Sequence, residues 1–350
     1  MSTVALHPES LGVTVSGRTH EFHYLWLRHH CDSSRHPQTG ERTLDPAEID
    51  PEIRPSSAEI VGRNGSEVLE VRWPEGLVSR FSVSELADRA YATDLGAVDI
   101  PETDVGRLTW SDSFDAAGIL SRVRASGAVV VRGWGEDTEA LIAQFEAQNL
   151  KVRETHFGRI EDLRTDNTTN KNTDQLGYTN SGVDLHTDQP YLEEPPEFQL
   201  LQSIRTADAG GESLLANGRA LVDYVKATSR QDYELLVSTP VVFHRQQKSF
   251  DKRLEVPLIV EEADGRVKIR LSYFTLAPFR YSFELTRDWY RAYRRLTSLA
   301  RSRFFLYDFL LRPGDFVLYD NLRMLHGRTA FRGPRWVRGV YFDNRSSAKA

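Results

Sequence analysis

Two short stretches of the chain, Leu185-His186-Thr187-Asp188-Gln189-Pro190 and Asp320-Asn321-Leu322-Arg323-Met324-Leu325-His326-Gly327-Arg328, indicate what kind of fold this sequence encodes. Side chains alternate between the two faces of a β-strand, so His186 and Asp188 are expected on one face, where both can bind the same metal ion. His326 comes from far along the chain and completes a set of two histidines and one carboxylate. This set occupies one face of an octahedron and leaves the other positions open, which is typical of iron(II). The spacing therefore predicts a strand-borne, open iron site.

An arginine follows the second stretch closely. Arg335 stands nine residues after His326, and a guanidinium is the planar, bidentate donor that a carboxylate group prefers. Arg338 competes for the same role, but its odd spacing from Arg335 turns it to the opposite strand face, so Arg335 is favoured. A lone His-x-Asp or a lone histidine is common in structural positions. The combination with Arg335 is what indicates a site.

The first hundred residues form a region of short alternating runs. Residues 68–73 and 77–83 flank Pro74-Glu75-Gly76, which predicts a hairpin, and Ser84 is expected to cap a helix over residues 85–91. A polar connection over residues 93–109 leads to Trp110. We therefore predict an N-terminal domain over residues 1–100 and a second, catalytic domain over residues 110–345.

The second region contains many strand patterns and few helical ones. Helices are predicted over residues 114–124, 137–149, 219–228 and 286–300, and strands over residues 128–131, 198–204, 239–244, 267–273, 306–311, 316–319 and 337–342. Residues 153–183 show little periodicity and are expected to form a lid or binding loop. The pattern predicts a mainly β protein with flanking helices, built on an antiparallel barrel or a double-sheet jelly roll.

Composition excludes several function classes. The chain has 350 residues, 40% hydrophobic content and a formal net charge of -6, which argues against nucleic acid as a partner. We expect no signal peptide and no membrane span, because the chain holds no run of eighteen apolar residues. Cys31 is the only cysteine, so no intrachain disulfide can form and a cytoplasmic location is expected. The expected partner is a small-molecule substrate.

From about Trp110 to Asn344 the chain resembles the taurine dioxygenase superfamily, and within it the gamma-butyrobetaine and trimethyllysine dioxygenase branch. The segments that carry the resemblance are His186 to Tyr191, Pro195 to Leu201, Gly210 to Ser213, Asp320-Asn321, His326 to Arg328, and Arg335 to Tyr341. The resemblance implies a double-stranded β-helix (jelly roll) core and a homodimer. It implies iron(II) on His186, Asp188 and His326, and 2-oxoglutarate on Arg335 with the help of Ser213, where the family often has Thr. An ordinary turn hydroxyl after two glycines is the other interpretation of Ser213.

The N-terminal region also resembles this branch. Residues 24–31 and 71–74 are similar to a small β-rich domain that precedes the catalytic core, and in some relatives this domain holds a structural zinc. Ser33 and His36 stand where further cysteines are expected, and Leu77 lies near the position of the zinc-binding histidine. Because Cys31 lacks enough partners for a tetrahedral site, we predict no zinc. His29, His30 and His36 are then expected to be polar surface or local hydrogen-bonding residues.

The resemblance assigns substrate contacts to Tyr178 and Tyr341, and Asn180 is expected to contact the substrate as part of a polar pocket. Relatives that oxidise trimethylammonium compounds surround the cation with aromatic rings, but Glu161 and Thr165 stand near the positions of further rings. A polar pocket, with Asp162 and Arg164 also nearby, would suit an amino acid-like zwitterion. The alternatives are that Tyr178 only packs the lid and that the substrate is a true betaine such as gamma-butyrobetaine or trimethyllysine.

The activity that these features imply is an iron(II)- and 2-oxoglutarate-dependent dioxygenase. It would use O2 to hydroxylate an unactivated carbon and would release succinate and CO2. Asp188 argues against halogenation, since halogenases of the superfamily lack this carboxylate, whereas desaturation, epoxidation and ring formation remain alternatives. Two other classes stay open: a metal- and ligand-binding sensor without turnover, and a hydrolytic or isomerising zinc enzyme, which would need a general base near the metal.

Overall fold

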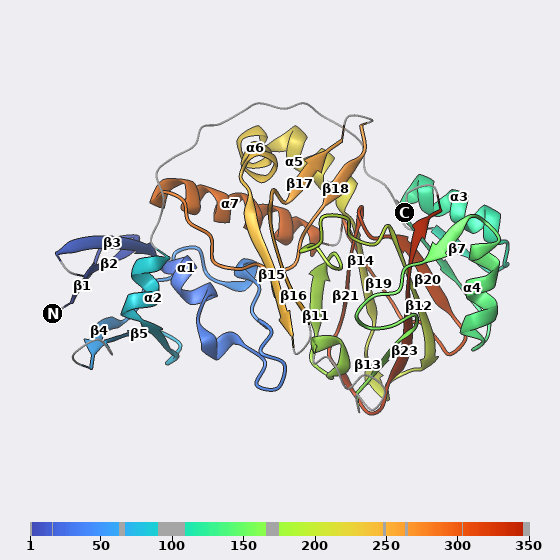
Figure 1. Ribbon diagram of the computed structural model, residues 1–350, viewed down its shortest axis with the longest axis horizontal. Coiled ribbons are helices and arrows are strands. Elements are labelled where there is room, and N and C mark those ends of the chain that lie inside the picture. Colours follow the sequence, from blue (N-terminus) through green and yellow to red (C-terminus); the bar gives the residue numbers. More distant parts are fainter. Residues whose placement is uncertain are drawn as a thin grey trace.

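Two β-sheets form the centre of the protein (Figure 1). The computed structural model describes residues 2–15, 17–62, 67–89, 109–165, 175–247, 250–262, 265–302 and 304–345. The larger sheet has the order β10-β23-β12-β20-β8-β7, with β9 also paired to β23; the smaller has the order β11-β21-β14-β19. Strands of the larger sheet are β7 (Thr109–Ser111), β8 (Ala128–Val131), β9 (Leu150–Val152), β10 (Glu161–Arg164), β12 (Phe198–Arg205), β20 (Phe316–Asp320) and β23 (Trp336–Asn344). Those of the smaller are β11 (Val183–His186), β14 (Ser213–Asn217), β19 (Leu306–Phe309) and β21 (Met324–Arg328).

The two sheets pack face to face. Val130 and Val317 of the larger sheet share one buried cluster with Leu215 and Met324 of the smaller, as expected for a sandwich of antiparallel sheets. The outer face of the larger sheet is covered by α3 (Ala116–Ser126) and α4 (Thr138–Glu146), which lie at one end of the molecule in Figure 1. The prediction of a mainly β protein with flanking helices is confirmed.

The remaining elements lie beyond the smaller sheet or at the N-terminal end. The helices are α1 (Tyr24–His29), α2 (Val83–Asp88), α5 (Gly218–Thr228), α6 (Arg230–Ser238) and α7 (Phe283–Ala300), with 3-10 turns η1 (Asp32–Ser34), η2 (Pro46–Glu48) and η3 (Leu176–Tyr178). The N-terminal strands are β1 (Thr3–Leu6), β2 (Ser10–Val15), β3 (Arg18–His23), β4 (Ser57–Val61), β5 (Val68–Arg72) and β6 (Val78–Ser82). Three two-stranded sheets are β13 (Ala209–Gly210) with β22 (Phe331–Arg332), β15 (Val241–Gln247) with β16 (Phe250–Val256), and β17 (Ile259–Glu261) with β18 (Val267–Ile269). No helix in the described ranges is long and apolar enough to cross a membrane.

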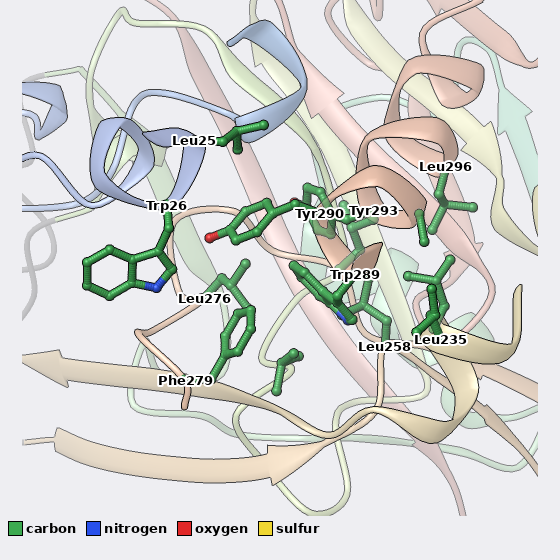
Figure 2. Close-up of a cluster of buried hydrophobic side chains, with 14 of the residues drawn as sticks. Leu25, Trp26, Leu235, Leu258, Leu276, Phe279, Trp289, Tyr290, Tyr293 and Leu296 are labelled. Atoms are coloured by element: carbon green, nitrogen blue, oxygen red, sulfur yellow. The ribbon is translucent and has the colours of Figure 1, made fainter. Parts of the chain in front are cut away.

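The N-terminal strands and helices share a hydrophobic core with α7. Leu25 and Trp26 of α1 belong to the same buried cluster as Trp289, Tyr290 and the rest of the apolar stripe of α7 (Figure 2). The stripe follows from the 3.6-residue period of the helix, which gathers its large side chains on one face. The N-terminal residues are thus fixed against α7.

Most predicted elements are confirmed, with two changes. The hairpin over residues 68–83 and the helices near residues 114, 137, 219 and 286 are present. Ser82, rather than Ser84, caps α2, because its hydroxyl accepts from the amide of Glu85. The prediction that residues 153–183 are a loop is wrong, because they contain β10 and η3. The predicted domain boundary near residue 100 lies outside the described residues.

The expected surface position of His29 and His30 is wrong. Both side chains are buried, His29 Nδ1 lies 2.8 Å from the hydroxyl of Tyr290 in α7, and His30 Nδ1 accepts from Arg42 at 2.9 Å. Their partners come from other parts of the fold, and the bond from His29 to Tyr290 joins α1 to α7. His36 is half-buried and makes only a local bond, from the amide of Gln38, and Cys31 is buried with its Sγ 2.7 Å from Ser33 Oγ.

Arg301, the C-terminal cap of α7, links the N-terminal residues to the strand that carries His186. Its Nη2 lies 2.9 Å from the buried carboxylate of Asp45, and its Nε donates to Asp184 at 2.9 Å. Arg301→Leu should destabilise the protein by about 2 to 4 kcal/mol, because Asp45 would remain buried without a cation. This loss of stability is smaller than that expected for a fully buried ion pair, because Arg301 is partly exposed. Urea unfolding measures the loss.

Arg287, on the same helix, is a matched control. It is more exposed and pairs with Asp288 at 3.1 Å, so Arg287→Ala should cost no more than about 1 kcal/mol. Equal decreases in the free energy of unfolding in the Arg301 and Arg287 variants would show that the buried partner of Arg301 contributes no extra stability.

Candidate metal centre and active site

His186, Asp188 and His326 lie together at one end of the smaller sheet. His186 ends β11 and pairs in register with His326 of the neighbouring strand β21. Asp188 Oδ1 lies 3.3 Å from His186 Nε2, and Asp188 Oδ2 lies 3.6 Å from His326 Nε2. The three ligand atoms are all within 4.8 Å of one another, and no second cluster of three such ligands occurs among the described residues. The arrangement can hold one metal ion.

The backbone around Asp188 differs from the predicted strand. Since β11 stops at His186, strand alternation does not place the carboxylate. Asn321 fixes the backbone of Asp188 instead. The amide of Asp188 donates to Asn321 Oδ1 at 2.8 Å, and Asn321 Nδ2 donates to the Asp188 carbonyl at 3.1 Å. The hydroxyl of Tyr341 donates to Asp188 Oδ2 at 2.8 Å. Such outer contacts orient a ligand before the metal binds.

The protonation states suit a divalent metal. His186 Nδ1 lies 2.8 Å from the carbonyl of Asp184, which can only accept, so Nδ1 carries a proton and Nε2 is the nitrogen that faces the other ligands. Burial and the neighbouring His186 lower the pKa of His326 to about 3, so its ring is neutral. Burial alone would raise the pKa of Asp188, but His326 and His186 outweigh burial and hold that pKa well below its usual range. The site therefore offers the Nε2 atoms of two imidazoles and one ionised carboxylate.

A glycine allows the two histidine strands to approach closely. A side chain at Gly327 would place its Cβ 2.7 Å from the Val183 carbonyl and 3.1 Å from the amide of Leu185. Backbone cannot move away as a flexible side chain can, so a larger residue would separate β21 from β11. The His326-Gly327 pair is thus a geometric requirement of the site.

Arg335 and Ser213 lie in the same cavity as the metal ligands. No hydrogen bond or ion pair to the Arg335 guanidinium occurs within the described parts of the chain; its closest charge-related contact is the ring of Phe331, 5.6 Å from the guanidinium carbon. Burial lowers the pKa of Arg335 to about 10, yet the group remains charged at neutral pH. A largely desolvated cation without an anion is a ready site for a carboxylate.

Arg338 faces away from this cavity. Its Nη1 donates to Thr138 Oγ1 at 3.0 Å, and its Nε donates to Asp162 at 3.4 Å. Its guanidinium is therefore already occupied on the other face of β23. The expected division of roles between the two arginines agrees with these contacts.

The three predicted substrate residues lie in different places. Tyr341 lines the cavity, but its hydroxyl is used on Asp188. Tyr178 is buried outside the cavity lining and donates to Glu161 Oε1 at 3.0 Å, and Asn180 is exposed. The structure brings only Tyr341 to the metal.

Three residues of the site gave no usable signal in the sequence. Asn321 stands inside the second motif, but only the fold reveals that it supports Asp188. Arg245 of β15 and Glu41 form a buried ion pair on the cavity wall, and the second carboxylate oxygen of Glu41 accepts from the amide of Leu176. Glu41 is remote in sequence from the motifs that carry the metal ligands and Arg335, so those motifs could not have indicated it.

Comparisons with known proteins place this site in a family. The family model described as "Taurine catabolism dioxygenase TauD, TfdA family" matches residues 88–341. The chain belongs to this family. It is 30% identical to the gamma-butyrobetaine dioxygenase of Pseudomonas sp. (strain AK-1), covering 95% of this chain and 91% of that protein. It is 25% identical to the mitochondrial trimethyllysine dioxygenase of Gallus gallus, covering 96% and 84%.

A solved structure of asparagine oxygenase with Fe(II), 2S,3S-3-hydroxyasparagine and succinate shares the fold of the TauD, TfdA member described here. The TM-score is 0.52 at 15% sequence identity, over 65% of this chain and 78% of that one. The protein is therefore an iron(II)- and 2-oxoglutarate-dependent dioxygenase with a jelly-roll core. Its two histidines and one carboxylate fit iron(II), and Arg335, with which no described residue pairs, fits a carboxylate of 2-oxoglutarate.

Proposed function

We propose that this dioxygenase hydroxylates an unactivated carbon of a small polar or zwitterionic, amino acid-like metabolite. His186, Asp188 and His326 would hold iron(II), and Arg335 with Ser213 would hold 2-oxoglutarate. The observation that carries the proposal is that the cavity joins an open triad to a guanidinium that no described residue pairs. A zinc hydrolase would have no use for this anchor.

The residues of the chain contribute positioning and water exclusion. When bound, iron(II) with 2-oxoglutarate and O2 supplies the oxidant, and the cosubstrate is converted to succinate and CO2. Arg335 would fix the distal carboxylate of the cosubstrate, and Asn321 and Tyr341 keep Asp188 in place. Catalysis depends on placing one carbon of the substrate beside the metal. The residues of the site would therefore contribute through positioning rather than through acid-base chemistry.

An anaerobic titration of the metal-free protein with iron(II) and 2-oxoglutarate tests the proposal. A weak visible charge-transfer band is expected when both are present, and Arg335→Ala should lose most of it at the same cosubstrate concentration. Tight iron binding without any band would contradict the proposal and favour a sensor or a redox-inert metalloenzyme.

A betaine is the second candidate substrate. The similarity to gamma-butyrobetaine and trimethyllysine dioxygenases favours it, and the rings of Phe157, Tyr191 and Phe274 line the cavity. Aromatic faces are the preferred surroundings of a quaternary ammonium. Succinate release with each compound distinguishes the two candidates.

We also propose that residues 1–100 form a gamma-butyrobetaine dioxygenase-like N-terminal domain ahead of a catalytic domain over residues 110–345. The separate three-stranded sheets β1-β2-β3 and β4-β5-β6 support this division. The proposed state is a homodimer in the cytoplasm, where a single buried thiol, Cys31, is compatible with reducing conditions.

A further inference from the structure

Glu161 places a carboxylate on the wall of the metal cavity. Its residue is only 4% exposed, and it lines the cavity together with the metal ligands and Arg335. The position follows from strand register: Glu161 of β10 lies opposite Gly339 of β23. The alternate residues of β23 on either side, Val337 and Tyr341, face the cavity. Gly339 has no side chain, and Glu161 Oε2 lies 3.8 Å from where its Cβ would be.

Only one oxygen of this carboxylate is used within the described parts of the chain. Oε1 accepts from the hydroxyl of Tyr178 at 3.0 Å and from the side-chain amide of Gln175. No described residue donates to Oε2. A buried carboxylate with one unused oxygen is costly unless it takes up a proton or a cation binds that oxygen.

No cation of the described protein neutralises Glu161. No lysine, arginine or histidine forms an ion pair with it there, and Arg245, whose charge acts on Glu161 and lowers its pKa, is already paired with Glu41. Burial, and after it the charge of Asp188, raises the pKa of Glu161 to about 8. The surroundings thus disfavour the bare carboxylate and would favour a cation placed beside Oε2.

The chemistry of a carboxylate oxygen specifies which cation fits. Ammonium and guanidinium groups with N–H bonds donate charge-assisted hydrogen bonds to carboxylates. A trimethylammonium group has no N–H and is held by aromatic faces instead. The ring of Tyr178 lies outside the cavity lining, and its hydroxyl is used on Glu161. The rings that do line the cavity are those of Phe157, Tyr191 and Phe274, and they compete with Glu161 for the cationic end of a substrate.

We propose that Glu161 binds an N–H-bearing cation of the substrate, a primary or secondary ammonium or a guanidinium, and so selects such substrates over their N-trimethyl analogues. The inference rests on the proposed function and names the substrate class. Glu161 is a specificity residue: it faces the end of the substrate that does not react. In the competing interpretation, Glu161 is only a structural partner of Tyr178 and Gln175.

The first experiment needs no variant. Succinate release by the iron-loaded enzyme with 2-oxoglutarate is measured with compounds that differ in N-methylation: 4-aminobutyrate against gamma-butyrobetaine and lysine against trimethyllysine, with arginine and the other common amino acids added. The N–H compounds are expected to trigger release, with a KM at least tenfold below that of any active N-trimethyl partner. Preference for the N-trimethyl members, or no response to any N–H compound, would overturn the inference.

The second experiment compares two neighbouring carboxylates. Glu161→Gln should raise the KM of the best N–H substrate by roughly 10- to 100-fold, the effect of losing one charge-assisted hydrogen bond. Asp162→Asn is the matched control, because Asp162 stands next in β10 but accepts from Trp336 Nε1 at 2.6 Å, away from the cavity. Equal KM values in the two variants would assign Glu161 a structural role only.

The two proposals fail in distinguishable ways. If the wild-type protein gives no charge-transfer band with iron(II) and 2-oxoglutarate, the proposed function is wrong. If the band forms but the N-methylation series or the Glu161→Gln variant behaves against expectation, only the role of Glu161 is wrong. Circular dichroism and the band itself show whether Glu161→Gln is folded.

Discussion

Asp188→Ala is expected to abolish detectable succinate formation while the protein remains folded. The change removes the only anionic ligand of the triad and leaves two neutral imidazoles, a much weaker set for iron(II). It also leaves the hydroxyl of Tyr341 without its acceptor. Iron binding under anaerobic conditions and succinate formation are the two measurements.

Tyr341→Phe provides a graded comparison for this prediction. It keeps the carboxylate ligand and deletes only the hydrogen bond that orients it, a class of change that costs about 10- to 100-fold in metal affinity or activity. Asp188→Ala should fall well below this level. Similar residual activities in the two variants would remove Asp188 from the set of ligands.

Arg335→Ala is expected to raise the KM for 2-oxoglutarate far more than it changes the affinity for iron. Truncating one partner of a buried, hydrogen-bonded charge pair costs about 2 to 5 kcal/mol, which is roughly 30-fold to several thousandfold in affinity. Arg335→Lys should lie between the wild type and Arg335→Ala, because an ammonium keeps the charge but not the bidentate geometry.

Arg338→Ala is the matched control on the same strand. Arg338 bonds to Thr138 and Asp162 on the other face of β23, so its loss should change the KM for 2-oxoglutarate by less than about threefold, as for a side chain remote from the site. If Arg338→Ala raises this KM as much as Arg335→Ala does, the assignment of the cosubstrate to Arg335 is wrong.

The metal ligands could be predicted because they belong to short sequence motifs of characteristic residue types. His186, Asp188 and His326 need particular donor atoms, and few residue types supply them. The same holds for strands such as β8, whose continuous apolar run marks a buried strand. Local pattern was sufficient in these cases.

Other features depend on contacts between distant segments, which no local pattern encodes. Residues of β10 show little alternation between apolar and polar side chains. The strand forms because it pairs with β23, which is distant in sequence. His29 looks like a surface residue until Tyr290 of α7 is placed against it. The family resemblance predicts that Tyr178 contacts the substrate, but η3 directs its hydroxyl to Glu161.

The position of Glu41 on the wall of the catalytic cavity has a consequence for how selectivity is inherited. Glu41 lies far upstream of the jelly roll, yet its carboxylate holds both Arg245 and the backbone of Leu176 beside the substrate space. Recombination between relatives in the intervening stretch would replace Glu41 while leaving Arg245, Leu176 and every metal ligand in place. A change confined to the N-terminal segment can therefore remove the buried partner of Arg245 and alter the cavity wall without any change to the oxidising centre.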